Sequence, residues 1–155
     1  MIEERVTFSN PSDTVLRAMI EIKTTPERVY EAWTRPDVLP KWFGPRSGGH
    51  LQVDRFEPTV GGGYDVTMVF ADGDRAQMIG EYRELDPPKR IVMTWQWTED
   101  AAPSAETLVT VDLAPSETGT HLTLTHERFP TTADRDQHQQ GWGPLLDRLA
   151  VLLTD

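Results

Sequence analysis

The chain has 155 residues, a size that suits one domain with a single hydrophobic core, and residues 1–155 are expected to form it. Its formal net charge is −10, with 25 acidic residues against 15 basic ones and no basic run, which argues against nucleic acid and anionic membranes as partners. The sequence contains no cysteine, so disulfides, thiolate metal sites and cysteine nucleophiles are excluded.

No stretch approaches the roughly 18 apolar residues of a membrane span. The N-terminal sequence MIEERVTFSNPSD carries acidic residues where a signal peptide needs a basic start and an apolar run. We therefore expect a cytoplasmic protein.

The first third of the chain predicts one strand and two short helices. Residues 1–13 read as a loose lead-in, and the alternation in Thr14–Ile22 predicts a strand. Thr25 is a suitable N-cap for a helix at Pro26–Thr34, with proline at the first helical position. A second short helix is expected at Pro36–Trp42.

The middle of the chain predicts an antiparallel meander, because apolar alternation recurs at about ten-residue spacing with turn signals between the runs. Asp72-Gly73-Asp74 is the clearest hairpin turn, Gly61-Gly62-Gly63 marks another, and Glu99–Ser104 reads as a loop. The six expected strands are His50–Glu57, Tyr64–Phe70, Arg75–Leu85, Arg90–Trp97, Glu106–Leu113 and Thr120–Glu127.

The last stretch, Thr131–Leu153, is the longest helical pattern. Its apolar face recurs at spacings of three and four and comprises Trp142, Leu145, Leu146, Leu149, Leu152 and Leu153. Gly141, Gly143 and Pro144 interrupt the pattern around Trp142, and a kink is expected at the proline.

Together these elements predict an α+β fold in which a curved antiparallel sheet of about seven strands wraps a long C-terminal helix, with two short helices after the first strand. At this point the sequence resembles the START-like, helix-grip (SRPBCC) superfamily, and within it the bacterial relatives of the activator of heat-shock-protein-90 ATPase. The stretches that carry the resemblance are PERVYEAWTRPDVLPKWFGP at Pro26–Pro45, GEYRELDPPKRIVMTWQW at Gly80–Trp97, LTLTHERFP at Leu122–Pro130 and HQQGWGPLLDRLAVLL at His138–Leu153.

The resemblance implies a cavity between the sheet and the final helix, and the glycines and proline around Trp142 favour a pocket there. Aromatic and thioether side chains at inward positions suit an apolar or amphipathic ligand. The alternative for each of them is ordinary core packing. The candidate ligand-binding residues are Trp42, Phe43, Met68, Phe70, Met78, Met93, Trp95, His126, Trp142 and Leu145.

The histidines give no metal-site pattern. His121 and His126 are five apart on one expected strand and face opposite sides, so they cannot share a metal ion. His126 and His138 could approach each other at the pocket mouth, which makes His126 a weak candidate for general acid–base catalysis. Neither a metal nor another cofactor is expected.

Three classes of function follow. The first is a binding domain for a small hydrophobic or amphipathic molecule, without catalysis. The second is a cyclase- or hydrolase-type enzyme that uses Tyr64, Tyr82 or His126 in the same cavity. The third is a co-chaperone of a heat-shock ATPase, although the named activator carries an additional domain for that work and 155 residues leave no room for one. A homodimer through an exposed strand edge is a further expectation.

Overall fold

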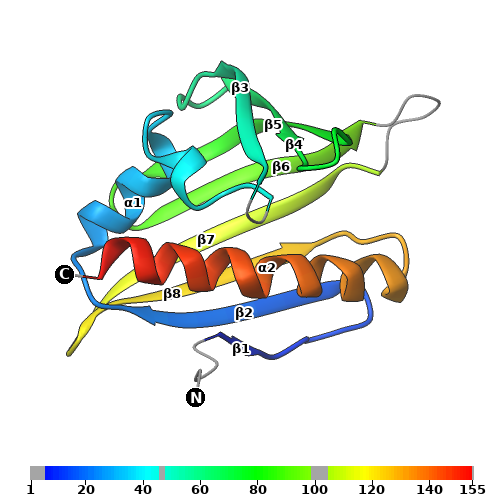
Figure 1. The fold of residues 1–155 in the computed structure, drawn as a ribbon. Helices are drawn as coiled ribbons and strands as arrows, with labels where there is room; N and C mark the ends of the chain where they lie inside the picture. Colours follow the sequence, from blue (N-terminus) through cyan, green and yellow to red (C-terminus); the bar gives the residue numbers. More distant parts are fainter. Residues whose placement is uncertain (1–5, 46–47, 99–104, 155) are drawn as a thin grey trace.

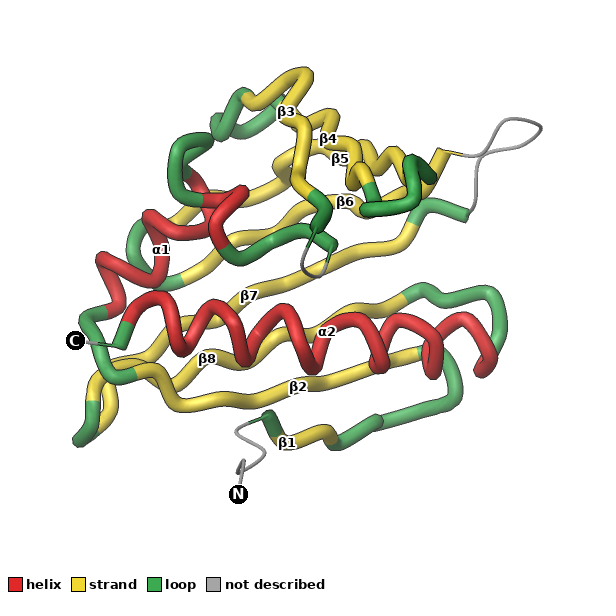
Figure 2. Tube along the Cα trace, viewed as in Figure 1, coloured by secondary structure: helices red, strands yellow, loops and turns green. Residues whose placement is uncertain are grey.

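The computed structural model describes residues 6–45, 48–98 and 105–154. Figure 1 shows a curved sheet with a long helix lying across its concave face, and Figure 2 shows the same arrangement by secondary structure. The elements in chain order are β1 Thr7–Phe8, β2 Val15–Ile22, α1 Pro26–Thr34, the 3₁₀ turn η1 Leu39–Lys41, β3 His50–Phe56, β4 Gly63–Val69, β5 Arg75–Asp86, β6 Arg90–Thr98, β7 Thr107–Ser116, β8 Gly119–Glu127 and α2 Thr132–Leu153.

All strand pairs in the described part are antiparallel, and the strand order is β1-β2-β8-β7-β6-β5-β4-β3. Strands β3 to β8 form the predicted meander, and β2 joins its end by pairing with β8 along its whole length. The α+β helix-grip prediction is confirmed.

Alternation of buried and more exposed residues along β2 explains why α2 packs against the sheet. Leu16, Ala18, Ile20 and Ile22 of β2 are buried, and the residues that alternate with them are more exposed. Leu146 and Leu149 of α2 are fully buried in the same core. Burial of apolar surface between these two faces therefore holds the helix against the sheet.

Helix α1 begins and ends as its sequence dictates. The Thr25 hydroxyl accepts a hydrogen bond from the backbone N–H of Arg28, and Pro26 occupies the first turn, where no donor is needed. Arg35 is extended because Pro36 follows it and disfavours a helical conformation. The predicted bounds of this helix are confirmed.

Two expectations for the first third of the chain were wrong. The expected helix at Pro36–Trp42 is only the single 3₁₀ turn η1, because Pro40 has no N–H to donate to the carbonyl of Pro36. The expected lead-in contains β1, where Phe8 pairs with Ala18. The expected loop Glu99–Ser104 lies outside the described residues.

The helix predicted at Thr131–Leu153 is confirmed as α2. The Thr131 hydroxyl caps it by accepting from the backbone N–H of Asp134, and the helix continues through Pro144 to Leu153. No helix in the described ranges has the length and apolarity needed to cross a lipid bilayer.

Candidate functional site: a cavity between the sheet and the C-terminal helix

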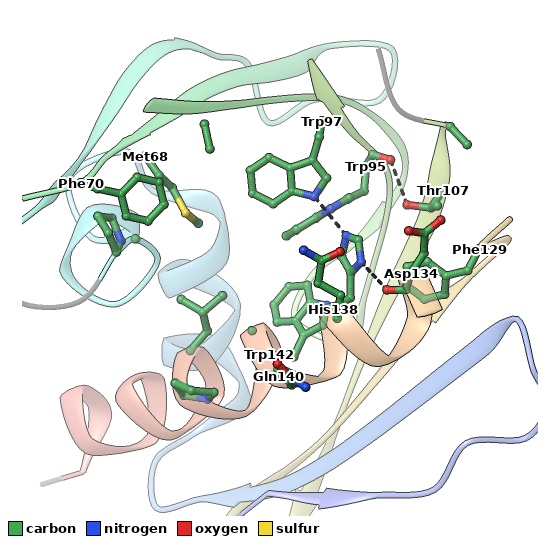
Figure 3. A pocket seen from close by; sticks show the side chains of 18 of the residues that line it. Met68, Phe70, Trp95, Trp97, Thr107, Phe129, Asp134, His138, Gln140 and Trp142 are labelled. Atoms are coloured by element: carbon green, nitrogen blue, oxygen red, sulfur yellow. Dashed lines mark hydrogen bonds between the residues drawn. The ribbon is translucent and has the colours of Figure 1, made fainter. Parts of the chain in front are cut away.

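A cavity of about 780 Å³ lies between α2 and the sheet. Figure 3 shows side chains from the strands and from the helix converging on it. Its lining is mainly apolar and aromatic. The lining residues are Gly44, Pro45, Met68, Phe70, Ala76, Trp95, Trp97, Ala105, Thr107, Phe129, Pro130, Asp134, Gln137, His138, Gln140, Gly141, Trp142, Pro144, Leu145 and Arg148.

The helix supplies one wall of this cavity. Lining residues recur along α2 from Asp134 to Arg148, fourteen residues and therefore about 21 Å at a rise of about 1.5 Å per residue. The cavity is thus elongated along the helix, with a carboxylate near one end and a guanidinium near the other.

The sheet supplies the facing wall. Trp95 and Trp97 are two residues apart on β6, so both project to the cavity side. Met68 at the end of β4 and Phe70 just after it complete the wall, and in Figure 3 they lie across the cavity from Trp97. Side chains of this kind suit a ligand without many polar groups.

His126 lies behind the cavity wall in a closed hydrogen-bond chain. The Thr107 hydroxyl donates to the backbone oxygen of Trp95 at 2.9 Å, so it must accept from Nε2–H of His126 at 2.7 Å. Nδ1 of His126 then accepts from the indole N–H of Trp142 at 3.1 Å. The imidazole is therefore neutral, fully paired and 0% exposed.

His138, by contrast, faces the cavity. Its Nδ1–H donates to the backbone oxygen of Asp134 at 2.8 Å, and its Nε2 accepts from the indole N–H of Trp97 at 3.0 Å (Figure 3). The ring centroids of His126 and His138 are 5.0 Å apart, so the expected approach of the two histidines is confirmed. They do not meet at the mouth of the cavity, because His126 is completely buried.

Both imidazoles are held in the neutral form. Burial lowers the pKa of His126 well below 6.5, and the charge that His138 would carry lowers it further. Burial also lowers the pKa of His138, although the hydrogen bond to Asp134 and the charge of that residue oppose the shift. The site is therefore built around two neutral hydrogen-bonded rings.

Arg148 closes the other end of the cavity. Its guanidinium donates to the backbone oxygens of Gly44 and Pro45 at 2.7 and 3.1 Å. These two bonds tie the segment after η1 to α2 across the cavity rim. A residue of the final helix thus fixes a part of the wall more than a hundred positions earlier in the sequence.

A second, much smaller cavity of about 30 Å³ lies deeper in the core. Phe43, Met78 and Met93 line it, together with both tyrosines of the enzyme hypothesis, Tyr64 and Tyr82. Of the residues that the structure describes, only Trp95 borders both cavities, so its indole lies between them.

Neither Tyr64 nor Tyr82 is suited to proton transfer at neutral pH. Tyr64 donates to the backbone oxygen of Thr94 at 2.6 Å, and burial raises its pKa well above 10. Burial raises the pKa of Tyr82 as well. Both side chains stay protonated and buried.

The ten predicted ligand-binding residues fall into three groups. Five line the large cavity: Met68, Phe70, Trp95, Trp142 and Leu145. Phe43, Met78 and Met93 line the small one. Trp42 and His126 line neither cavity, and both are fully buried. Trp42 donates its indole N–H to the backbone oxygen of Ala32 at 2.9 Å.

The candidate ligand-binding residues omitted three notable members of the large cavity, although His138 was expected at its mouth. Trp97 shares the strand face of Trp95, and His138 lies one helical turn before Trp142, so a consistent use of those periods would have found both. Arg148 could not be found in this way, because its role depends on the path of the segment after η1.

The helix interruptions around Trp142 coincide with the cavity. Gly141 and Pro144 line it, whereas Gly143 points towards Phe8, 3.8 Å from where a Cβ would lie. A Cβ on Gly141 would meet no atom within 4 Å. Within a helix each glycine costs about 1 kcal/mol and the proline about 3 kcal/mol relative to alanine, yet no protein neighbour requires a glycine at Gly141.

Within the described ranges, three or more His, Asp or Glu side chains do not gather into a set that could hold a metal ion. Several polar side chains of the cavity, among them Thr107, His138 and Trp97, are used for internal hydrogen bonds, whereas the buried indole N–H of Trp95 has no partner among the described residues. The arrangement therefore offers an apolar molecule a largely aromatic surface.

A curved antiparallel sheet closed on a long C-terminal helix, with an apolar cavity between the two, defines a START-like helix-grip domain. The family described as "Activator of Hsp90 ATPase homolog 1-like protein" matches residues 23–154. The chain belongs to this family. A search of curated proteins found no match.

Solved bacterial structures share the fold over nearly the whole chain. A protein from Chromobacterium violaceum is 30% identical, with a TM-score of 0.83 over 92% of this chain and 99% of its own. A protein from Rhodobacter sphaeroides is 28% identical, with a TM-score of 0.83 over 96% and 97% of the two chains. The AHSA1 protein from Silicibacter pomeroyi is 28% identical, with a TM-score of 0.80 over 90% and 96%.

Proposed function

We propose that the protein binds a small hydrophobic or amphipathic molecule in the large cavity, without catalysing a reaction on it. The observation that carries this proposal is the cavity itself, about 780 Å³ in volume and walled by aromatic and thioether side chains. Cavities of roughly 300–1,000 Å³ with such walls are typical of small-molecule sites.

The state of the histidines supports binding rather than catalysis. Both nitrogens of His126 and both of His138 are already engaged in hydrogen bonds within the protein. A general base needs a lone pair within reach of a substrate proton. Each of these rings would first have to give up an existing partner.

A cytoplasmic location, a homodimer through a sheet edge, and the enzyme and co-chaperone alternatives remain predictions of the sequence. In the described part of the chain, β1 and β3 are the outermost strands and would be the edges available for pairing.

Titration with the uncharged dye Nile red tests the proposal. Ala76 on β5 is a small residue of the cavity wall, so Ala76→Phe would place a ring in the space that a ligand needs. We expect saturable binding by the unmodified chain, weakened about tenfold or more in this variant, which corresponds to at least about 1.4 kcal/mol.

Ala114→Phe is the matched control, because Ala114 is an exposed strand residue of β7 that lines neither cavity. Its affinity for the dye should equal that of the unmodified chain. No saturable binding, or the same loss in both variants, would refute the large cavity as the binding site.

A further inference from the structure

The polar groups in the wall of the large cavity are largely committed to partners within the protein. The Thr107 hydroxyl bonds to His126 and to the backbone of Trp95, and both nitrogens of His138 are engaged. The indole N–H groups of Trp97 and Trp142 donate to the two histidines. These side chains therefore offer a ligand mostly aromatic surface.

Two groups in the same wall differ from these: the buried indole N–H of Trp95 has no hydrogen-bond partner among the described residues, and one backbone carbonyl of α2 lacks its usual donor. In an α-helix the carbonyl of residue i accepts from the N–H of residue i+4. Pro144 has no N–H, so the carbonyl oxygen of Gln140 lacks that donor. Gln140 and Pro144 both line the cavity one turn apart, and Gln140 is exposed, so this acceptor lies on the cavity side of α2 at the solvent-facing rim.

The residue next to this carbonyl leaves room for a ligand to reach it. Gly141 has no side chain, and a Cβ there would meet no protein atom within 4 Å. Gly143, two positions on, does not line the cavity. Gly141 and Pro144 together form what we call the notch: a position of the helix wall without a side chain, next to a backbone acceptor and to Trp142 in the sequence.

Resting on the function proposed above, we propose that the ligand is an apolar molecule that carries a hydroxyl or amine donor. The donor binds the carbonyl oxygen of Gln140, and the apolar part of the molecule lies over Gly141 against the aromatic wall. Gly141 and Pro144 are then specificity-determining residues. Restoring a regular helix at either position would stabilise the fold and impair recognition.

The test uses 1-naphthol and 1-methoxynaphthalene, which have the same ring system and each offer an oxygen acceptor, whereas only the naphthol can donate. Affinities would be measured by calorimetry on the full chain. We expect the naphthol to bind the unmodified protein about fivefold more tightly, the effect of one hydrogen bond. In Pro144→Ala the new N–H pairs with Gln140, and the two affinities should become equal.

The two glycines provide a matched pair of variants. Gly141→Ala and Gly143→Ala should raise the melting temperature alike, by roughly 3 °C each, because both replace glycine in a helix interior. Only Gly141→Ala should weaken binding of both compounds. Equal weakening in the two variants would refute the notch, since a Cβ on Gly143 lies on the Phe8 side of α2.

Asp134 is the charged acceptor that competes with this assignment, and the side-chain amides of Gln137 and Gln140 line the same cavity. Loss of the preference for naphthol in Asp134→Asn, but not in Pro144→Ala, would overturn the proposal. Equal binding of both compounds by the unmodified protein would also overturn it, while leaving the cavity as a binding site. Failure of both compounds to bind would overturn it as well, and the Nile red titration would then decide the proposed function separately.

Discussion

Replacing Thr107 by valine removes one hydroxyl from the hydrogen-bond chain behind the cavity while nearly preserving the shape of the side chain. That hydroxyl has two partners, the backbone oxygen of Trp95 and Nε2–H of His126. All three residues are at most 5% exposed, so water cannot replace it. A change of tautomer would not help His126, because its other nitrogen faces the indole N–H of Trp142.

The expected loss of stability follows from these contacts. Two buried groups lose their partner at about 1–3 kcal/mol each, and the added methyl returns about 0.8 kcal/mol of apolar burial. We expect Thr107→Val to lower the free energy of unfolding by roughly 1–5 kcal/mol, measured by urea denaturation. The indole N–H resonance of Trp142 should shift as well, since its acceptor is disturbed.

Thr110→Val is the control, because Thr110 lies on the same strand at a half-buried outward position. Its free energy of unfolding should change by no more than about 0.5 kcal/mol. If Thr107→Val were as mild as this control, the inferred chain of hydrogen bonds through His126 would be wrong.

Two further predictions concern the same core. The folded chain holds His126 neutral with a lowered pKa, whereas a histidine of the unfolded chain titrates near 6.5. Below that pH the unfolded state therefore binds more protons than the folded state, and the free energy of unfolding falls as pH falls. His126→Gln should therefore reduce the slope of unfolding free energy against pH, by at most about 1.4 kcal/mol per pH unit, at pH values below the unfolded pKa of about 6.5, in urea titrations at each pH. An unchanged slope would mean that His126 is protonated in the folded state. Tyr64→Phe removes the donor to a buried backbone oxygen and should cost about 1 kcal/mol of unfolding free energy in the same assay, whereas no loss would show that this carbonyl finds another partner.

The fold could be predicted from the sequence because its periodicities are local. Alternation in β2 and β6, the cap at Thr25 and the apolar face of α2 each act within a few residues. The error at Pro36–Trp42 came from giving the helix signal at Pro36 more weight than the missing donor of Pro40.

The site could be predicted only in part, because inward-facing side chains divide among a cavity, a packed core and a second cavity. Met68 and Met93 read alike in the sequence, yet one lines the large cavity and the other the small one. Which cavity an inward-facing side chain lines depends on where α2 packs against the sheet. That placement is set by tertiary contacts such as the hydrogen bonds of Arg148 to the backbone of Gly44 and Pro45.

The role of His126 changes most between sequence and structure. The pattern made it a candidate catalytic group, whereas the structure places it under Trp142 as the acceptor of the indole N–H. Removing His126 would therefore leave Trp142 with a buried, unsatisfied donor and disturb binding even in a protein that catalyses nothing. Loss of function in His126→Ala would not separate an enzyme from a binding protein.

The five tryptophans allow the central claim to be measured directly. Each indole N–H gives its own signal in a ¹H–¹⁵N NMR spectrum, and Trp95, Trp97 and Trp142 line the large cavity while Trp33 and Trp42 do not. During titration with 1-naphthol, we expect the first three signals to shift in a saturable manner and the other two to remain in place. Shifts confined to Trp33 and Trp42, or no saturable shift at all, would contradict a ligand site between α2 and the sheet.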